Sequence, residues 1–136
     1  MAIFRFELVS PERLLFAGDV EQVDVPGVEG DFGVLADHAP LVTTLRPGIL
    51  TVHTADAAQK FVVLGGFAEV SAKGLTVLAD IANTIEEMDR EIISRRMDEL
   101  EKLIEQAKQG SELDKMIRQL DQYKTVDRTL TGTAMH

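Results

Sequence analysis

The feature of this sequence that most constrains its fold is a change in the period of its hydrophobic pattern between residues 82 and 84. Before that point, apolar and polar residues alternate in short runs, as they do in strands with one buried face. After it, apolar residues recur at steps of three and four, which is the spacing of one face of a helix. We therefore expect two domains, a β domain at residues 1–83 and an α-helical domain at residues 84–136.

The β domain is expected to contain many short strands. Its clearest alternating or apolar runs are residues 4–8, 23–25, 50–54, 61–64 and 75–79. Turn signals such as Pro26-Gly27, Pro47-Gly48 and Gly65-Gly66 separate them. Short strands with a turn at about every 8–12 residues are typical of a β sandwich or a barrel.

The helical domain is expected to be an antiparallel two-helix hairpin. Thr84 to Glu87 has the form of a capping box that starts the first helix. Gly110 can end that helix, Ser111 can cap the next one, and residues 129–136 are expected to fray. The apolar seams are Ile93, Met97, Leu100, Ile104 and Ala107 in the first helix, and Leu113, Met116, Ile117, Leu120 and Tyr123 in the second.

Composition excludes several classes of function. The formal net charge is −9, with 14 basic against 23 acidic residues, so the average surface would repel a nucleic-acid backbone. The absence of cysteine excludes disulfides and thiol nucleophiles. No apolar run reaches the roughly 18 residues that a membrane span needs, and we expect no secretory signal. Proteins with basic or polar patches are the expected partners.

Catalytic and metal-binding groups are not expected either. His38, His53 and His136 are far apart in the sequence, and none has a neighbouring ligand at metal spacing. His38 follows a carboxylate but has no serine or cysteine nucleophile beside it. We therefore expect no catalytic residue, no metal and no cofactor.

An acidic, glycine-rich loop is expected at residues 27–33. Its three glycines free the backbone, and Glu29 and Asp31 lie between them, so the loop would present carboxylates outward. Such a loop on a β domain, followed by a helical hairpin, favours contact with other proteins. Two hypotheses remain open from the residues alone. One is a stalk or adaptor subunit with the hairpin as a movable arm, and the other is a sensor whose hairpin closes on the β domain around a small anion.

Blocks of residues across the first 80 positions carry a family resemblance through their order and spacing. The blocks are Val9-Ser10-Pro11-Glu12, Leu15-Phe16 with Gly18, Gly27 to Leu35, His38-Ala39-Pro40-Leu41, Leu45-Arg46-Pro47-Gly48, Gly65-Gly66-Phe67 with Glu69-Val70, and Val77-Leu78-Ala79-Asp80. Together they resemble the epsilon subunit of bacterial F-type ATP synthases, called delta in mitochondria. The resemblance covers nearly the whole chain.

The resemblance implies a non-catalytic rotor subunit of the central stalk, which helps to couple proton flow to ATP synthesis. A ten-stranded sandwich would bind the gamma subunit and the c-ring within a hetero-oligomer at the cytoplasmic face of the bacterial inner membrane. The membrane would be reached only peripherally, through the complex. The implied c-ring contacts are Glu29, Gly30, Asp31, Phe32 and His38, and the implied gamma contacts are Leu41, Val42, Thr43 and Leu45.

In that family the hairpin regulates ATP hydrolysis. It can fold against the sandwich, or it can extend to the alpha/beta catalytic head and inhibit hydrolysis there. Members that bind ATP carry Ile/Leu-Asp-x-x-Arg-Ala, and the matching stretch here is Met88 to Ile93, with Ile92 at the arginine position. An aliphatic side chain cannot make the forked contact of a guanidinium with phosphate. The candidate nucleotide ligands are therefore Asp89 with Arg95 or Arg96. A stand-alone ATP- or anion-sensing module is the alternative function.

Family members that strongly inhibit ATP hydrolysis have a basic last helix, and the last helix of this chain departs from that pattern. Its bases are Lys115, Arg118, Lys124 and Arg128, and they are offset by Glu112, Asp114, Asp121 and Asp127. We expect weak or absent inhibition of ATP hydrolysis by the extended hairpin.

Overall fold

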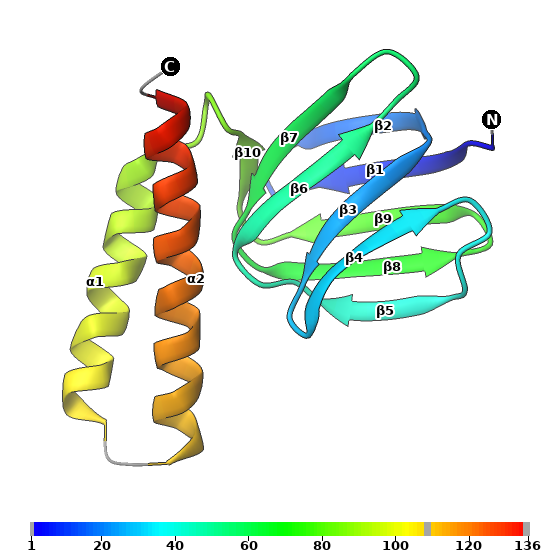
Figure 1. Ribbon diagram of the computed structural model, residues 1–136. Helices are drawn as coiled ribbons and strands as arrows, with labels where there is room; N and C mark the ends of the chain where they lie inside the picture. Colours follow the sequence, from blue (N-terminus) through cyan, green and yellow to red (C-terminus); the bar gives the residue numbers. More distant parts are fainter. Residues whose placement is uncertain (1, 108–109, 135–136) are drawn as a thin grey trace. The chain divides into compact units, whose positions relative to one another are not determined.

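The computed structural model describes residues 2–107 and 110–134. The chain divides into two compact units, Met1–Thr84 and Ile85–His136, close to the boundary expected from the pattern. The described part of the first unit contains ten strands in two five-stranded sheets, and that of the second contains two helices (Figure 1). The predicted fold class, a β sandwich followed by an antiparallel two-helix hairpin, is confirmed.

The two sheets of the sandwich differ in the relative direction of their neighbouring strands. The first sheet has the order β2 (Leu14–Val20), β1 (Phe4–Val9), β9 (Gly74–Ala79), β8 (Gly66–Ser71), β5 (Leu41–Thr44). Within it, β1 runs parallel to β9, and the other neighbours are antiparallel. The second sheet is antiparallel throughout, in the order β10 (Ala82–Thr84), β7 (Ala58–Val63), β6 (Gly48–His53), β3 (Gln22–Gly27), β4 (Gly30–Leu35).

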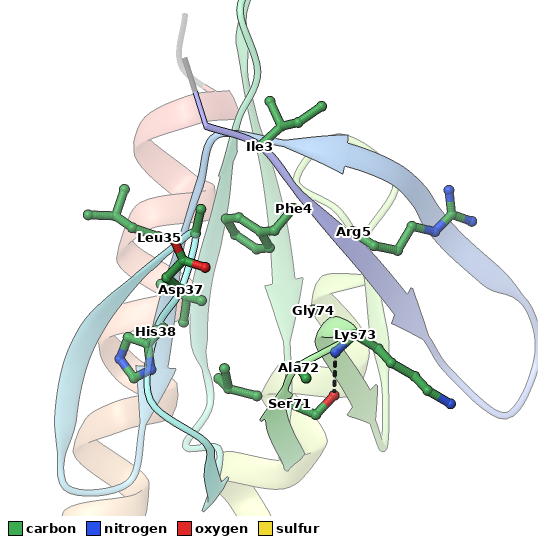
Figure 2. Close-up of a pocket in the computed structure, with 13 residues that line it drawn as sticks. Ile3, Phe4, Arg5, Leu35, Asp37, His38, Ser71, Ala72, Lys73 and Gly74 are labelled. Atoms are coloured by element: carbon green, nitrogen blue, oxygen red, sulfur yellow. Dashed lines mark hydrogen bonds between the residues drawn. The ribbon is translucent and has the colours of Figure 1, made fainter.

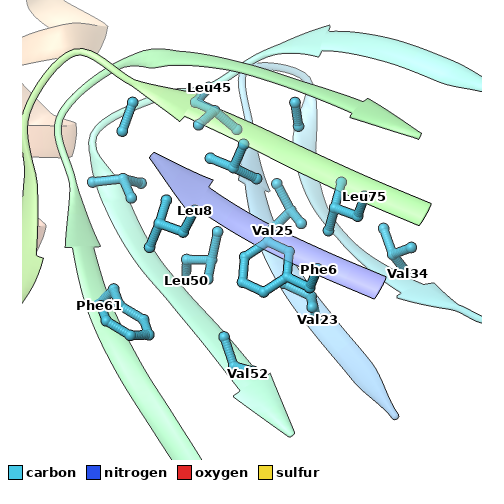
Figure 3. Close-up of a cluster of buried hydrophobic side chains, with 14 of the residues drawn as sticks. Phe6, Leu8, Val23, Val25, Val34, Leu45, Leu50, Val52, Phe61 and Leu75 are labelled. Carbon is cyan, nitrogen blue, oxygen red and sulfur yellow. The ribbon is translucent and has the colours of Figure 1, made fainter. Parts of the chain in front are cut away.

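Alternate side chains of both sheets meet in one apolar core (Figure 3). Phe6, Val23, Leu50 and Phe61 are among its members, each with at most 1% of its surface exposed. Burying one such side chain stabilises a fold by about 1.5–3 kcal/mol, so the alternation read from the sequence is what holds the sheets together. The remaining buried members are Leu8, Val20, Val25, Val34, Leu45, Val52, Val63, Ala68, Val70, Leu75, Val77 and Ala79.

The start of the first helix differs from the prediction. The capping box expected at Thr84 is wrong, because Thr84 is the last residue of β10 and pairs there with Phe61 of β7. Helix α1 is Arg90–Gln106, and its N-cap is Asp89, whose side chain accepts a hydrogen bond from the backbone N–H of Glu91 at 2.9 Å. The long-range strand pairing takes precedence over the local signature.

The second helix is longer than expected. Helix α2 runs from Ser111 to Ala134, so residues 129–134, which were predicted to fray, are helical. Residues 135 and 136 lie outside the described part of the chain. Val126 and Leu130 extend the predicted seam by two further turns, and both are buried. Their spacing of four residues keeps them on one face of the helix.

Polar contacts link the two helices along their length. One nitrogen (Nη2) of Arg90 donates to Asp127 Oδ1 at 3.2 Å and to Thr131 Oγ1 at 2.8 Å. Arg96 Nη1 donates to the hydroxyl of Tyr123 at 3.5 Å. These pairs join the start of α1 to the end of α2, as an antiparallel hairpin requires.

Candidate partner-binding surfaces

The acidic loop predicted at residues 27–33 is the tip of the β3–β4 hairpin. Gly27 pairs with Gly30, so Val28 and Glu29 form the two-residue turn between the strands. A Cβ atom on Gly27 would lie 2.8 Å from the carbonyl oxygen of Gly30 and 3.0 Å from the ring of Phe32. The close approach of the two strands therefore needs glycine at this position.

The tip is fixed by contacts that the sequence did not predict. Arg46 follows β5, and its backbone N–H donates to the carbonyl of Pro26 at 3.0 Å. Its guanidinium donates from Nη1 to the carbonyl of Gly27 at 2.6 Å and from Nη2 to Asp31 Oδ1, forming an ion pair. The backbone N–H of Val28 also donates to the carbonyl of Thr44 at 2.8 Å. The glycine-rich tip is therefore held in place up to Val28, and Glu29 of the turn extends beyond these contacts.

The two carboxylates of the tip consequently differ. Asp31 is paired with Arg46, although 73% of its side chain remains exposed. Glu29 is exposed and forms none of the ion pairs or side-chain hydrogen bonds found in the described part of the chain. Val28 beside it is 52% exposed. The sequence predicted two equivalent carboxylates, whereas the structure separates a paired one from an unpaired one.

Phe32 and His38 also belong to the predicted set; Phe32 lies on β4 and His38 in the loop that follows it. Phe32 is half-buried and packs against the sandwich core. The ring of His38 lies 6.4 Å from that of Phe32, and its Nδ1 is 2.7 Å from the carbonyl oxygen of Ala39. His38 also lines a cavity of about 310 Å³ with Phe4, Arg5 and Lys73 (Figure 2).

The predicted gamma-contact residues fall on different faces of the first sheet. Val42 faces outward and is 66% exposed, and Leu41 at the sheet edge is 38% exposed. Thr43 pairs with the buried Ala68 and shares its inward-facing side of the sheet. Leu45 is 3% exposed within the core, so its side chain is not available to a partner. A run of four neighbours cannot share one face, because successive strand residues point to opposite sides.

A row of apolar side chains crosses the outer face of the first sheet instead. Leu14 pairs with Val9, Val9 with Leu78, and Leu78 with Phe67, so one row spans β2, β1, β9 and β8. Leu14, Phe67 and Leu78 are 57%, 46% and 39% exposed. Val42 on β5, paired with Glu69, continues the same face at the sheet edge. We call Val9, Leu14, Val42, Phe67 and Leu78 the outer stripe.

A polar cluster occupies the outer face of the second sheet. His53 Nε2 lies 2.7 Å from Asp24 Oδ2, and Gln22 Nε2 donates to Asp24 Oδ1 at 2.7 Å. Burial acts to raise the pKa of Asp24, but hydrogen bonds from His53 and Gln22 and the charge of His53 outweigh it, so that the pKa lies below its usual value of 3.8. His53 was expected to be a half-exposed sheet residue, and it is one.

The predicted nucleotide ligands have separate structural roles. Asp89 caps α1, Arg95 Nε donates to the carbonyl of Glu91 at 3.4 Å within its own helix, and Arg96 contacts Tyr123. Adjacent residues diverge by about 100° around a helix axis, so Arg95 and Arg96 project in different directions. Their contacts do not bring the three side chains around one point.

The basic residues of the predicted regulatory helix, which bear on the inhibition of ATP hydrolysis, lie on the exposed side of α2. Lys115, Arg118, Lys124 and Arg128 are all exposed. Arg128 donates to Thr125 Oγ1 at 3.1 Å. Of the acids that offset them, Asp127 is engaged by Arg90.

Within residues 2–107 and 110–134, no three histidine or acidic side chains lie close enough together to hold a metal ion. Neither helix of the described part is long and apolar enough to cross a membrane.

Comparison with known proteins gives concordant matches. The family model for the "ATP synthase, Delta/Epsilon chain, beta-sandwich domain" matches residues 3–85. An "ATP synthase epsilon chain" from Rhodopseudomonas palustris is 58% identical over 136 residues and covers 100% of both chains. An "ATP synthase epsilon chain 1" from Nitrobacter hamburgensis is also 58% identical, over 137 residues and 100% of both chains.

Solved structures with the same fold come from mitochondrial ATP synthases. A chain of the Euglena gracilis enzyme aligns with a TM-score of 0.68 at 25% identity, covering 100% of this chain and 83% of its own length. A chain from the central stalk and c-ring of the Tetrahymena thermophila enzyme aligns with a TM-score of 0.54 at 14% identity, over 62% of this chain and 68% of its own. This second match bears on the fold alone.

Proposed function

Because this chain belongs to the ATP synthase delta/epsilon family, we propose that its sandwich joins the gamma subunit to the c-ring as part of the central stalk. The resemblance drawn from the sequence blocks is confirmed by the family model and by relatives that match the whole chain. The protein is an accessory subunit of the synthase complex and not itself the catalyst. Its partners in that complex are gamma, the c-ring and the alpha/beta head.

The observation that carries this proposal is the outer stripe. Four of its five members are more than a third exposed. The register of the sheet places all members but Val42 in one row, and Val42 lies on the same face at the sheet edge, paired with Glu69. Contiguous exposed apolar surface on a small protein marks an interaction site. A polypeptide face of gamma would bury the stripe, and Val42 is the member already predicted as a gamma contact.

Substitution within the stripe tests this contact. Phe67→Asp places a charge in the middle of the proposed interface, and we expect it to weaken gamma-dependent co-elution with the catalytic head by about tenfold or more. Leu35→Asp is the matched control, because Leu35 is comparably exposed, at 56% against 46% for Phe67, but lies on the second sheet. Gel filtration would be run with a head that contains gamma and with one that lacks it. Co-elution of Phe67→Asp at the wild-type level would contradict the assignment.

The β3–β4 tip is the proposed contact with the c-ring. Its exposed acidic turn can dock on basic polar loops of the ring and set the register between the two bodies. Replacing Glu29 and Asp31 together by lysine should lower the ratio of proton pumping to ATP hydrolysis in the assembled enzyme. Normal pumping by an assembled double variant would remove the tip from the interface.

We infer the location of the subunit and its regulatory role from its place in the same complex. The subunit lies at the cytoplasmic face of the bacterial plasma membrane, reached through gamma and the c-ring. Its hairpin acts weakly on ATP hydrolysis, since the exposed bases of α2 are balanced by acids. A nucleotide-sensing role has less support, because Asp89 and Arg96 already serve as a helix cap and as a contact to Tyr123.

A further inference from the structure

Arg46 contacts both strands of the β3–β4 hairpin at the base of its turn. Its guanidinium reaches the carbonyl of Gly27 at the end of β3 and the carboxylate of Asp31 near the start of β4. Only 24% of its side chain is exposed, so most of it is packed against the protein. An arginine can do this because its planar fork carries several donors in a fixed arrangement.

The backbone beside Arg46 supports the same segment. Leu45 forms an isolated antiparallel bridge with Gly27, and the N–H of Val28 donates to Thr44. The chain between β5 and β6 thus lies along the end of β3 and fixes it up to Val28. In the turn, the backbone of Val28 is thus still held by Thr44, and Glu29 projects beyond this support.

We infer that Arg46 is a positioning residue, which holds the hairpin tip in one shape and compensates the charge of Asp31. Glu29, next to the exposed Val28, is then the one unpaired carboxylate at the tip, and it binds a basic side chain of the docked ring. This inference rests on the proposed function for its partner, but the arrangement of the tip does not. It assigns different roles to two carboxylates that a sequence pattern treats alike.

The arrangement of the tip can be tested on the full chain without any partner. In Arg46→Gln, amide hydrogen exchange at Val28 should accelerate by about tenfold, because the support of the turn is removed. Arg46→Lys should accelerate it nearly as much, since one ammonium cannot replace both guanidinium contacts. Asp31→Asn should change it little, because the contact to Gly27 remains. Unchanged exchange in Arg46→Gln would overturn the positioning role.

The roles of the carboxylates are tested in the assembled enzyme in membranes. Glu29→Gln should lower the ratio of proton pumping to ATP hydrolysis several-fold, and Asp31→Asn should lower it clearly less, because Arg46 already compensates the charge of Asp31. Arg46→Gln should resemble Glu29→Gln, and combining the two should cause no further loss, because Arg46 acts through the position of Glu29. A merely structural role of Arg46 would instead give additive losses, and that result would overturn the inference.

The two proposals fail in different ways. If the double lysine variant at Glu29 and Asp31 pumps normally, the tip is not a ring contact, and the proposed function fails at this site. If that variant is uncoupled but Glu29→Gln and Asp31→Asn are equally impaired, both carboxylates dock, and the distinction drawn here is wrong.

Discussion

The sandwich and the helical hairpin bury their apolar side chains in different ways. The core of the sandwich contains sixteen buried residues drawn from both sheets, many of them joined by pairs far apart in the sequence. Helix α1 buries only Ile93 and Leu100, and Leu103 on the same helix is 51% exposed. The hairpin is joined by one narrow seam and a few polar pairs. The sandwich is therefore held by a large shared core, whereas the hairpin depends on far fewer buried side chains, among them Leu120, Tyr123, Val126 and Leu130 of α2.

The largest effect should come from the core of the sandwich. Phe6 is fully buried, and Phe6→Ala should lower the free energy of unfolding by about 3–5 kcal/mol through lost burial and a residual cavity. Urea denaturation followed by circular dichroism would measure it. The control is Leu103→Ala on α1, whose side chain is half-exposed, so its loss should be far smaller. Equal losses would remove the contrast between the two units.

A smaller effect is expected from the polar pairs of the hairpin. Arg90→Ala removes the contacts to Asp127 and Thr131, and it should destabilise the helices by about 0.5–1 kcal/mol, because the guanidinium is half-exposed. Thermal melts at a helix-sensitive wavelength would detect a lower midpoint. Arg95→Ala is the matched control, since Arg95 contacts only its own helix. A midpoint for Arg90→Ala no lower than that of the control would show that these pairs contribute nothing.

The pair of His53 and Asp24 on the second sheet should contribute a comparable or smaller amount to the free energy of unfolding, and this contribution should depend on pH. The pKa of Asp24 is lowered in the folded chain, so its contribution to stability is present above 3.8 and is lost as the pH falls through the folded-state pKa. His53→Ala should cost about 0.2–1 kcal/mol near pH 6 and much less at a pH below the folded-state pKa of Asp24, where that carboxyl is protonated. Denaturation at both pH values would measure the difference. In an Asp24→Asn background the cost should be the same at both values, and a persistent pH dependence would point to another group.

The smallest effect is expected from removing the hairpin altogether. β10 ends at Thr84, so a truncation after Thr84 keeps both sheets intact, whereas one after Ala82 would remove most of that strand. ATP hydrolysis by the assembled head with this truncated subunit should rise less than about twofold, because the exposed face of α2 lacks net positive charge. A several-fold rise would show that the extended hairpin is a strong inhibitor.

The hydrophobic pattern of the sequence predicts which face of each strand is buried, but it does not predict which strands pair with each other. Alternation placed Phe6, Val23, Leu50, Val52 and Val77 on the buried face, because one side of each strand must be apolar. β10 was missed because its pairing with β7 is a long-range contact, whereas a capping signature at Thr84 is visible in four residues.

The candidate partner-binding surfaces likewise depend on long-range contacts that a local sequence pattern does not reveal. The outward residues of the outer stripe follow from alternation once the sheet order is known, but that order joins β1 to β9 across most of the sandwich domain. The pairing of Arg46 with Asp31 depends on where the connection after β5 runs, which no spacing rule indicates. Glycine content predicted a mobile loop, and the contacts of Arg46 give it a fixed base.

The position of β1 within its sheet has a consequence for how the protein is made. β1 lies between β2 and β9, so the strand synthesised first needs its parallel neighbour from residues 74–79 before the sheet can close. Closing so long a segment before it gains native contacts favours slow folding dominated by non-local pairs. The emerging chain therefore exposes the apolar faces of its early strands until nearly the whole sandwich has been synthesised.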